Sequence, residues 1–377
     1  MNNKKVLSIS HDFLKKVNFR FYEEWSRDKN FKITCLAPTY FYETHKKIYV
    51  DTKKKLNSLD FIQKKLFFKN SRFFFFKELQ KVIKKTKPDV VILHNDPISI
   101  QSMILIFFSF IYKYKICYFT HENNLINFFK KKSLKKFIKI IILLIFNLLI
   151  KSKVSYIFCI SKQIKKNYEF LGYKNKTILT PLGYDEKIFN LKNKSIKKNK
   201  NKFTISYFGR ISKVKGVHIL IKSLEKIKFN FNFMMDIDFI EDKDYFKNLM
   251  HNLKKILHKK KINLIKCNHT TIANFMSKSD LVVVPSLYEE QYGRVIQESV
   301  ACGSLVIGSR VGAIPEIIKD KDLLFISNNS NDLSLKINKL SNNKYFNRKF
   351  KKLYLRVLKE RTINKQIEII KRLKIFK

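Results

Sequence analysis

Two glutamates, Glu290 and Glu298, are the residues of this chain whose types and spacing most clearly predict chemistry. Seven residues separate them, and Gly293 lies where a loop is expected to turn into a helix that ends near Cys302 and Gly303. A helix N-terminus presents free N–H groups and a partial positive charge, so it suits a phosphate. The two carboxylates cannot be phosphate ligands, but they could accept hydrogen bonds from sugar hydroxyls. This segment therefore predicts a site for a phosphate-linked sugar.

A second charged pair, Arg210 and Lys215, precedes the glutamates. Four residues separate the two, and both follow the apolar run Phe203–Phe208, which predicts a strand. Arg and Lys at the mouth of a strand can neutralise a diphosphate from the side opposite a helix N-terminus. Arg210 and Lys215 are thus candidates for the other half of a diphosphate site.

Strands and helices are expected to alternate along the whole chain. The strands expected in the first half are Val6–Ser10, Phe31–Pro38, Val90–Leu93, Ile116–Thr120, Tyr156–Ile160 and Thr177–Thr180. Those expected in the second half are Phe203–Phe208, Phe233–Phe239, Leu264–Lys266, Leu281–Val284 and Leu305–Ile307. The alternation predicts doubly wound α/β domains with parallel sheets, which bind ligands at the C-terminal ends of their strands.

The chain is strongly basic. Its 377 residues include 78 Lys and Arg against 30 Asp and Glu, a formal net charge of +48. This excess indicates nucleic acid or an anionic membrane surface as partners, but an A/T-rich genome would produce the same surplus of Lys, Asn, Ile and Phe. The basic residues are spread over both halves, and the sequence contains no nucleic-acid recognition motif. Nucleic-acid binding is therefore the weaker alternative.

The cysteines and the apolar runs indicate the compartment. Five scattered cysteines without paired spacing predict reduced, structural thiols and no zinc site. The apolar runs Met103–Tyr112 and Ile138–Ile150 are shorter than the ~20 residues that span a bilayer. The N-terminus shows no signal-peptide pattern. We expect a cytoplasmic protein.

Four motifs in order carry a resemblance to a known family. They are Gly209-Arg210 with Lys215-Gly216, EEQYGRVIQESVACG, GSRVGAIPE, and PLGYDEKIF just before the basic segment 191–202. Together they resemble the retaining, nucleotide-sugar-dependent glycosyltransferases of family 4, also called glycosyl transferases group 1. The resemblance implies the α/β fold known as GT-B, with two Rossmann-like doubly wound domains facing across a cleft.

The expected domain limits follow from the motifs and the linker. The ranges are 1–190 for an acceptor-binding domain, 191–202 for the linker, 203–360 for a nucleotide-sugar-binding domain, and 361–377 for a C-terminal helix packing back toward the first domain.

The resemblance also implies roles on the donor side. Arg210 and Lys215 would bind the diphosphate and stabilise the leaving nucleoside diphosphate, with no metal or other cofactor required. Glu290 would hold the hydroxyls of the donor sugar, and Glu298 those of the ribose. The backbone at the helix start and two flanking positions complete the expected donor contacts: Tyr292, Gly293, Arg294, Val295, Gly209 and Glu316. For Glu316, a helix cap is an equally good interpretation.

Two histidines follow strands of the first domain. His121 resembles the histidine that many family members place near the reacting sugar, and His94 fits that role less well. For both, a packing or surface role is the alternative. Further acceptor contacts are expected at the end of strand one and after His121: His11, Asp12, Glu122 and Asn123, with His94. The glycine-rich turn that relatives carry after strand one is missing here.

The expected reaction is transfer of a sugar from a nucleoside-diphosphate sugar to a hydroxyl acceptor with retention of configuration. A lipid-linked or cell-surface glycan is the expected acceptor, as in lipopolysaccharide, capsule or exopolysaccharide synthesis. The segments Lys64–Lys77 and Lys130–Lys151 mix basic and apolar residues and could rest on an anionic membrane as a peripheral contact, or could be core helices with basic flanks. A GT-B synthase or epimerase acting on soluble sugars remains the alternative within enzymes.

Overall fold

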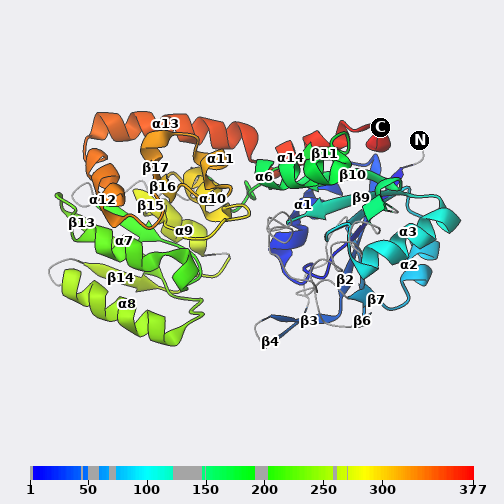
Figure 1. The fold of residues 1–377 in the computed structure, drawn as a ribbon, viewed down its shortest axis with the longest axis horizontal. Helices are drawn as coiled ribbons and strands as arrows, with labels where there is room; N and C mark the ends of the chain where they lie inside the picture. The colour runs from blue at the N-terminus through cyan, green and yellow to red at the C-terminus, as the bar shows by residue number, and fades with distance from the viewer. Residues whose placement is uncertain are drawn as a thin grey trace, which may run out of the picture. The chain divides into compact units, whose positions relative to one another are not determined.

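The computed structural model describes residues 3–43, 46–49, 59–67, 74–121, 147–148, 150–191, 203–257, 261–269 and 271–377. The chain forms two compact units (Figure 1). The first unit comprises Met1–Pro181 and the C-terminal Gln366–Lys377, and the second comprises Leu182–Lys365. The limits expected from the sequence, with a linker at 191–202, stay a prediction, and most of that linker lies outside the described residues.

The first unit is built on a parallel sheet with the strand order β11-β10-β9-β8-β1-β2-β5. Its main strands are β1 (Lys4–Ile9), β2 (Phe31–Pro38), β5 (Asp60–Lys64), β8 (Val90–Leu93), β9 (Lys115–Thr120), β10 (Val154–Cys159) and β11 (Thr177–Leu179). The small antiparallel pairs are β3 (Tyr40–Glu43) with β4 (Lys46–Tyr49) and β6 (Leu66–Phe67) with β7 (Phe75–Phe76). Val90–Leu93 is buried at every position, as expected of a strand covered on both faces.

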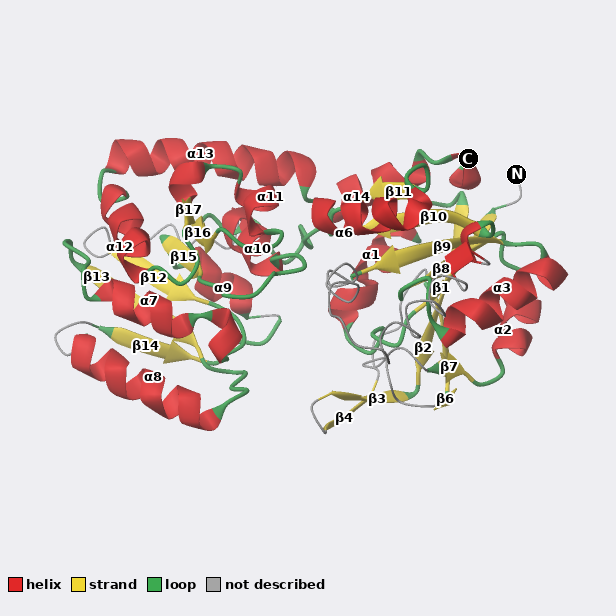
Figure 2. Ribbon diagram, in the orientation of Figure 1, coloured by secondary structure: helices red, strands yellow, loops and turns green. Residues whose placement is uncertain are grey.

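Helices cover this sheet (Figure 2). They are α1 (Lys16–Trp25), α2 (Leu79–Thr86), α3 (Ile100–Tyr112) and α6 (Lys162–Tyr168), which continues into a π-helical turn at Glu169–Tyr173. Ser161 is the N-cap of α6, because its side chain accepts a hydrogen bond of 3.3 Å from the backbone N–H of Ile164. The apolar run Ile138–Ile150, within the basic segment Lys130–Lys151, falls mostly outside the described residues.

The second unit repeats this plan with the strand order β14-β13-β12-β15-β16-β17, again parallel throughout. The strands are β12 (Phe203–Tyr207), β13 (Phe231–Asp236), β14 (Ile262–Ile265), β15 (Leu281–Val284), β16 (Leu305–Ser309) and β17 (Leu324–Phe325). The helices are α7 (Val217–Leu224), α8 (Lys243–Ile256), α9 (Ile272–Ser277), α10 (Arg294–Ala301), α11 (Ile314–Ile318), α12 (Ser330–Lys339) and α13 (Asn343–Glu360). In both sheets, therefore, the strand order reverses beside the first strand of the unit.

The end of the chain returns to the first unit. Helix α14 (Ile363–Lys371) is followed by a short 3-10 turn at Lys374–Phe376. The buried Phe376 packs on Trp25 with ring centroids 5.3 Å apart, and Lys371 forms an ion pair with Asp28. The last residues thus complete the core around α1.

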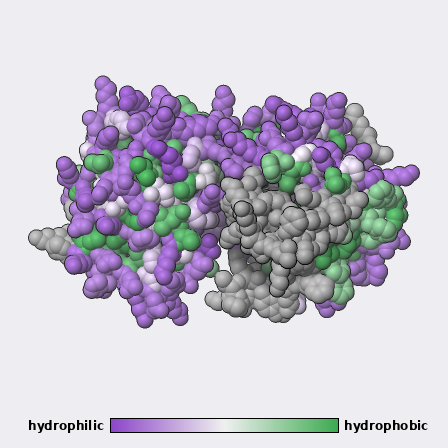
Figure 3. All heavy atoms as spheres, in the orientation of Figure 1, coloured by the Kyte–Doolittle hydropathy of each residue, from purple (hydrophilic) through white to green (hydrophobic). Residues whose placement is uncertain are grey.

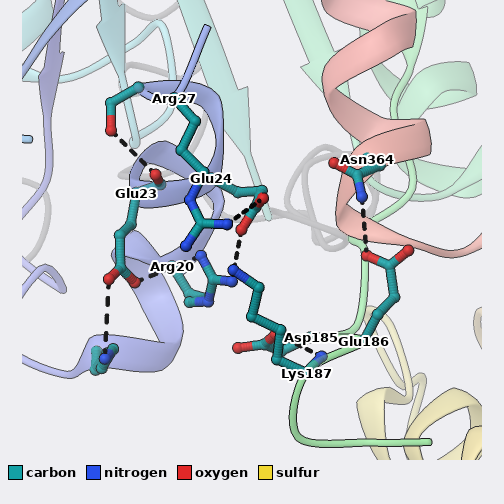
Figure 4. Close-up of polar contacts among 10 residues, drawn as sticks. Arg20, Glu23, Glu24, Arg27, Asp185, Glu186, Lys187 and Asn364 are labelled. Atoms are coloured by element: carbon teal, nitrogen blue, oxygen red, sulfur yellow. Dashed lines mark hydrogen bonds and ion pairs between the residues drawn. The ribbon is translucent and has the colours of Figure 1, made fainter. Parts of the chain in front are cut away.

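Each unit also carries polar contacts that fix its own elements (Figure 4). On α1 the buried Arg20 donates a hydrogen bond of 2.6 Å to Glu24 and lies 3.4 Å from Glu23. In the second unit, the side chain of Asn364 donates to Glu186 at 3.5 Å. None of the described helices is both long and apolar enough to cross a membrane.

Candidate active site

The reversal of strand order in the second sheet lies between β12 and β15, which pair with each other in parallel. The loop after β12 carries Gly209, Arg210 and Lys215, and the loop after β15 carries Glu290. Open α/β sheets bind ligands outside the carboxyl ends of the strands at such a reversal. The two charged motifs of the sequence are therefore brought to one place.

The backbones of these two loops touch. The N–H of Leu287 donates a hydrogen bond of 2.9 Å to the carbonyl of Val214. Gly216 has φ +66°, and a Cβ at this position would lie 2.0 Å from the carbonyl oxygen of Pro285. Only glycine tolerates both the left-handed conformation and this close approach. Gly216 therefore allows Lys215 to lie next to the loop that carries Glu290.

Lys215 and Glu290 form an ion pair at the centre of the cluster. The Nζ of Lys215 lies 2.5 Å from Oε1 of Glu290 and 3.1 Å from the hydroxyl of Tyr288. The Tyr288 hydroxyl donates 2.9 Å to Oε2 of Glu290, and the Ser286 hydroxyl donates 2.7 Å to Oε1. The carboxylate is buried and its two oxygens share three donors. This arrangement fixes the orientation of both charged groups.

Tyr288 is protonated in this cluster. Its pKa is raised because burial penalises the phenolate and the charge of Glu290 opposes a second negative charge, while Lys215 acts in the opposite direction. A neutral hydroxyl can donate to Glu290 and accept from Lys215 at the same time. The tyrosine therefore joins the two ions.

A third loop supports Glu290 from behind. The N–H of Ala313 donates 2.9 Å to the carbonyl of Glu290, and Gly312 approaches so closely that a Cβ would lie 2.4 Å from the same oxygen. The Ser309 hydroxyl donates 2.7 Å to the carbonyl of Ser286. The motif GSRVGAIPE, whose role was unassigned by spacing alone, thus holds the glutamate loop in place.

Helix α10 begins where the sequence predicted. Gly293, with φ +134°, is its N-cap, and Arg294 and Val295 form its first turn. Tyr292 precedes them, but its side chain is buried: its hydroxyl lies within hydrogen-bond distance of the Leu182 carbonyl and, at 2.8 Å, of Oε1 of Gln297. At this corner a ligand could meet the backbone of these residues but not the Tyr292 ring.

Glu298 lies one turn further along α10. It keeps partial exposure, yet the protein packed around its carboxylate raises its pKa to about 7, while the nearby Arg294 acts in the opposite direction. The carboxylate therefore changes charge near neutral pH. Its ability to accept hydrogen bonds from ligand hydroxyls would therefore vary with pH near neutrality.

Arg210 points to a different partner. Its Nε lies 3.6 Å from Glu241, and both side chains are partly exposed. Glu241 is positioned by backbone hydrogen bonds between the two loops, from its own N–H to Ile211 at 3.1 Å and from Ile211 to Phe239 at 2.9 Å. Gly209, with φ +131°, starts this loop. Arg210 thus belongs to the same strand end as Lys215 but not to the Glu290 cluster.

Glu316 lies in the first turn of the short helix α11. Its carbonyl accepts a hydrogen bond of 3.2 Å from the buried Arg361, which also lies 3.4 Å from the Tyr292 hydroxyl. The backbone of Glu316 therefore has a structural contact, and the two interpretations of its carboxylate both stay open.

The first unit gathers three histidines at the carboxyl ends of β1, β8 and β9. A hydrogen bond of 2.7 Å joins Nε2 of His94 to the Tyr22 hydroxyl. The His94 ring also stacks on Phe119, with ring centroids 4.9 Å apart. Burial lowers the pKa of His94 well below its usual value, and the charges of His121 and His11 lower it further. His94 is therefore neutral and packed, whereas His121 lies 6.5 Å from Phe119 at the end of β9.

His11 is enclosed by aromatic rings. Phe41 and Phe74 lie 5.1 Å and 4.9 Å from its ring centroid, and its Nε2 lies 3.2 Å from Asp12. Burial lowers its pKa, against the effect of Asp12, and the buried Nδ1 has no hydrogen-bond partner among the residues that the structure describes. An unpartnered buried nitrogen at the end of β1 is suited to a ligand hydroxyl. Glu122 and Asn123 lie outside the described residues.

Several residues of these clusters were not predicted from the sequence. Tyr288 and Ser286 hold Glu290, and Asp96 accepts hydrogen bonds from Thr120 at 2.7 Å and from Tyr168 at 3.0 Å near the histidines. The only available signal was position, since each follows or ends a buried strand at a carboxyl end. Within the described residues, no group of three or more His, Cys, Asp or Glu is arranged to hold a metal ion.

Comparison with known proteins identifies the second unit. Residues 188–353 match the family model described as Glycosyl transferases group 1. We refer to this matched segment as the group 1 domain. The matched residues include Lys215, Glu290 and Glu298 and the loops after β12, β15 and β16 that surround Glu290.

Relatives of the group 1 domain include proteins of several kinds. An uncharacterised glycosyltransferase of Methanocaldococcus jannaschii is 35% identical over 192 residues, which cover 50% of this chain and 50% of that protein. The spore coat protein SA of Bacillus subtilis is 32% identical over 125 residues, covering 31% of this chain and 32% of that protein. The matches thus span half or less of the relatives' own lengths.

Solved structures show that the fold extends over both units. A glycosyltransferase from Rickettsia africae superposes with a TM-score of 0.74 at 17% identity, covering 99% of this chain and 100% of that one. HepE of Anabaena, crystallised with UDP and glucose, superposes with a TM-score of 0.70 at 16% identity and 98% coverage of both chains. The predicted fold class is confirmed: the chain has the GT-B fold, with a group 1 domain as its second Rossmann-like unit.

Proposed function

We propose that this protein is a retaining glycosyltransferase of family 4. It transfers a sugar from a nucleoside-diphosphate sugar to a hydroxyl of a lipid-linked or cell-surface glycan, in the synthesis of lipopolysaccharide, capsule or exopolysaccharide. It acts in the cytoplasm, peripherally at the inner face of the cytoplasmic membrane. The group 1 domain and the GT-B fold support a nucleotide-sugar donor, and HepE provides a structural neighbour that binds UDP and glucose.

The observation that carries the proposal is the contact between Lys215 and Glu290. A lysine at the carboxyl end of β12 and a buried glutamate at the carboxyl end of β15 meet at the reversal of strand order, 2.5 Å apart. A cation and a hydrogen-bond acceptor at such a point match the two halves of a sugar diphosphate. Lys215 would bind the diphosphate, and Glu290 would bind the hydroxyls of the transferred sugar.

In this mechanism the protein acts mainly on the leaving group. When the bond between the anomeric carbon and the diphosphate oxygen breaks, negative charge builds on that oxygen. Lys215 and Arg210 would stabilise it without a metal ion, with the N–H groups at the start of α10 as further donors. No carboxylate is placed as a nucleophile, so the acceptor hydroxyl attacks from the face that the diphosphate leaves, which retains the configuration. Glu298 would hold the ribose.

The acceptor side is assigned to the first unit. His121 would lie nearest the reacting hydroxyl, with His11, Asp12, His94, Glu122 and Asn123 as acceptor contacts. The clustering of His11, His94 and His121 at the carboxyl ends of adjacent strands supports this assignment. His94 is the weakest member, because its Tyr22 and Phe119 contacts already give it a packing role.

A donor panel tests the proposal without knowledge of the acceptor. The purified chain is incubated with UDP- and GDP-linked sugars, and the released nucleotide and the first sugar anomer formed by slow hydrolysis are measured by NMR. We expect release from one donor class, without added metal and with the donor's own anomeric configuration. An inverted product would contradict the retaining mechanism, and the absence of release and of nucleotide binding would contradict the proposal itself.

Thermal denaturation distinguishes the alternative partners. UDP or GDP should raise the melting temperature, because a ligand that binds only the folded state stabilises it. Duplex and single-stranded oligonucleotides should have no effect at physiological salt. Stabilisation by oligonucleotides alone would favour the nucleic-acid-binding alternative.

A further inference from the structure

Helix α3 has its polar and apolar faces reversed. A helix on the surface of a protein in water normally packs its apolar side chains inward and exposes polar ones. In α3 the residues that point inward include Gln101 and Ser102, both fully buried, with Leu105. No Asp, Glu, Lys or Arg occurs anywhere in the helix, from Ile100 to Tyr112.

Each of the two inward polar residues makes a hydrogen bond that favours this orientation of the helix. The side-chain oxygen of Gln101 accepts a hydrogen bond of 3.0 Å from the N–H of Phe76. The hydroxyl of Ser102 lies 2.6 Å from that of Tyr118 on β9. Rotation of α3 to bury its apolar face would break both contacts and leave buried polar groups without partners. The reversal is therefore a built feature of the first unit.

The outward face is large and apolar. Met103, Phe107, Phe110 and Ile111 are exposed by 41%, 63%, 62% and 52%. Figure 3 shows hydrophobic residues gathered at the end of the first unit where Figure 1 places α3. An exposed patch of this kind marks an interaction surface, whereas isolated exposed apolar residues do not.

A basic cavity adjoins the end of this helix. It has a volume of about 940 Å³, and Tyr112 and Lys113 at the C-terminal end of α3 form part of its wall. Its cationic lining consists of Lys4, Lys84, Lys87, Lys113, Lys115 and Lys374. Its one carboxylate, Asp89, accepts a hydrogen bond of 2.7 Å from the backbone of Lys5. Among the described residues, none of the six ammonium groups is in an ion pair.

The apolar face and the basic rim are continuous. The Nζ of Lys153 lies 3.8 Å from the centre of the Phe110 ring, and Lys113 directly follows the last turn of α3. The cavity opens at the amino ends of β1, β8 and β9, the edge opposite the histidines. This surface is thus distinct from the proposed acceptor site.

We propose that this face docks the first unit on an anionic lipid surface. Phe107, Phe110 and Ile111 insert among the acyl chains, and the lysines around the cavity bind lipid phosphates, which is how interfacial helices with a basic rim bind membranes. With 13 residues, α3 lies on the membrane and does not span it. Lysines occur over the whole chain and would not by themselves carry this inference. The inference depends on the exposed apolar face of α3 beside these lysines.

Vesicle cosedimentation tests this docking independently of any enzymatic activity. The full chain is mixed with vesicles of phosphatidylglycerol and phosphatidylcholine in equal amounts, or of phosphatidylcholine alone. We expect binding only to the anionic vesicles, weakening as salt rises. Phe107→Ser with Phe110→Ser should lower the partition coefficient by about tenfold or more. Lys84→Gln, Lys115→Gln and Lys374→Gln together should lower it by about a hundredfold, at about fivefold per lysine.

A matched variant controls for general loss of exposed apolar surface. Leu335→Ser with Leu355→Ser changes helix residues of the second unit with comparable exposures, 63% and 55%, and should bind as the wild type does. Circular dichroism verifies that all variants are folded. Equal binding by the phenylalanine variant, or wild-type binding that ignores anionic lipid, would overturn the proposal. A dimer in light scattering that depends on Phe107 and Phe110, without vesicle binding, would assign the face to a second copy and also overturn it.

Discussion

Lys215, Tyr288 and Ser286 all make hydrogen bonds to the two carboxylate oxygens of Glu290. These contacts fix the orientation of its side chain. A buried carboxylate without hydrogen-bond partners would be costly, whereas here three donors hold the side chain in one orientation. Two of these donors face it from its own loop, so the orientation exists before any ligand binds. Ligand binding therefore does not have to supply the free energy needed to orient the Glu290 side chain.

Removing the Tyr288 hydroxyl tests that arrangement. Tyr288→Phe keeps the ring but deletes the link between Lys215 and Glu290, leaving both ions free to shift. We expect kcat/KM for the nucleotide sugar to fall about tenfold, with a stability loss near the ~1 kcal/mol of one hydrogen bond. Steady-state kinetics and urea unfolding measure the two effects. Unchanged kcat/KM would show that the link is not needed.

We expect Glu298 to make nucleotide binding depend on pH. Its pKa is raised to about 7, so lowering the pH from about 8 to about 6 protonates it and removes an acceptor for ribose hydroxyls. The Kd for UDP or GDP should therefore rise about tenfold over this range, and binding near pH 7 should release a proton. Calorimetry in buffers of different ionisation enthalpy measures both quantities. Glu298→Gln should abolish the proton release, and its persistence would contradict the assignment.

At the scale of elements, the site depends on loops that contact one another at the carboxyl end of the second sheet. Gly216 and Gly312 allow the loops after β12 and β16 to touch the loop after β15, through Pro285 and Glu290. Side chains at either glycine would force these loops apart. The spacing of Lys215 and Glu290 is thus set by backbone contacts.

Gly216→Ala should separate the loops. The methyl group meets the rigid carbonyl of Pro285 at 2.0 Å, in addition to the ~1–2 kcal/mol of a left-handed alanine. We expect a lower melting temperature and a loss of nucleotide-sugar turnover. Gly172→Ala is the matched control, because it shares a positive φ but its methyl group meets only the flexible end of Lys151. It should lower stability but leave turnover unchanged, and equal activity loss in both variants would contradict the role of the close approach.

The sequence predicts some elements well and others not at all. The buried strands Val90–Leu93 and Leu281–Val284 have the predicted bounds, because continuous β-branched runs ended by polar residues leave little choice. The strands β3 to β7 were not predicted, since β6 and β7 have only two residues each and β3 to β5 mix charged residues with apolar ones. Strand order depends on pairing between distant segments, so it could not be derived from local patterns.

The same distinction applies to the site. Lys215, Glu290 and the start of α10 could be predicted because each belongs to a local motif at the end of a strand. The partners Tyr288 and Ser286, and the pairing of Arg210 with Glu241, depend on how the loops fold against each other. The exposure of Phe107 and Phe110 on α3 could not be predicted, because the apolar run Met103–Tyr112 does not indicate which side of the helix faces solvent.

At the scale of the whole molecule, the two ends of the first unit's chain share one core. The single tryptophan, Trp25, is buried against Phe376, and Lys371 pairs with Asp28. Tryptophan fluorescence therefore reports on the first unit alone and on the attachment of the C-terminal segment. The second unit contains no tryptophan, so its unfolding does not contribute to this signal.

Phe376→Ala should loosen this attachment. Removing a buried aromatic ring that packs on Trp25 should destabilise the first unit by about 3–5 kcal/mol and change the fluorescence of Trp25. Urea unfolding followed by fluorescence measures both effects. The exposed Leu355 on α13 is the control, and Leu355→Ala should leave the transition unchanged. An unaltered transition in the Phe376 variant would show that the segment adds no stability.

The account as a whole depends on a charged contact at the carboxyl ends of β12 and β15 acting on a sugar diphosphate. The most direct measurement compares nucleotide-sugar turnover by the wild type, Lys215→Ala and Lys213→Ala. Lys213 lies in the same turn, but its ammonium group lies 3.9 Å from Asp242. Lys213→Ala therefore removes the same charge from the loop without removing the contact with Glu290. We predict that Lys215→Ala lowers turnover about a hundredfold or more, with folding retained, while Lys213→Ala stays within about twofold of the wild type. Wild-type turnover by Lys215→Ala would contradict the account.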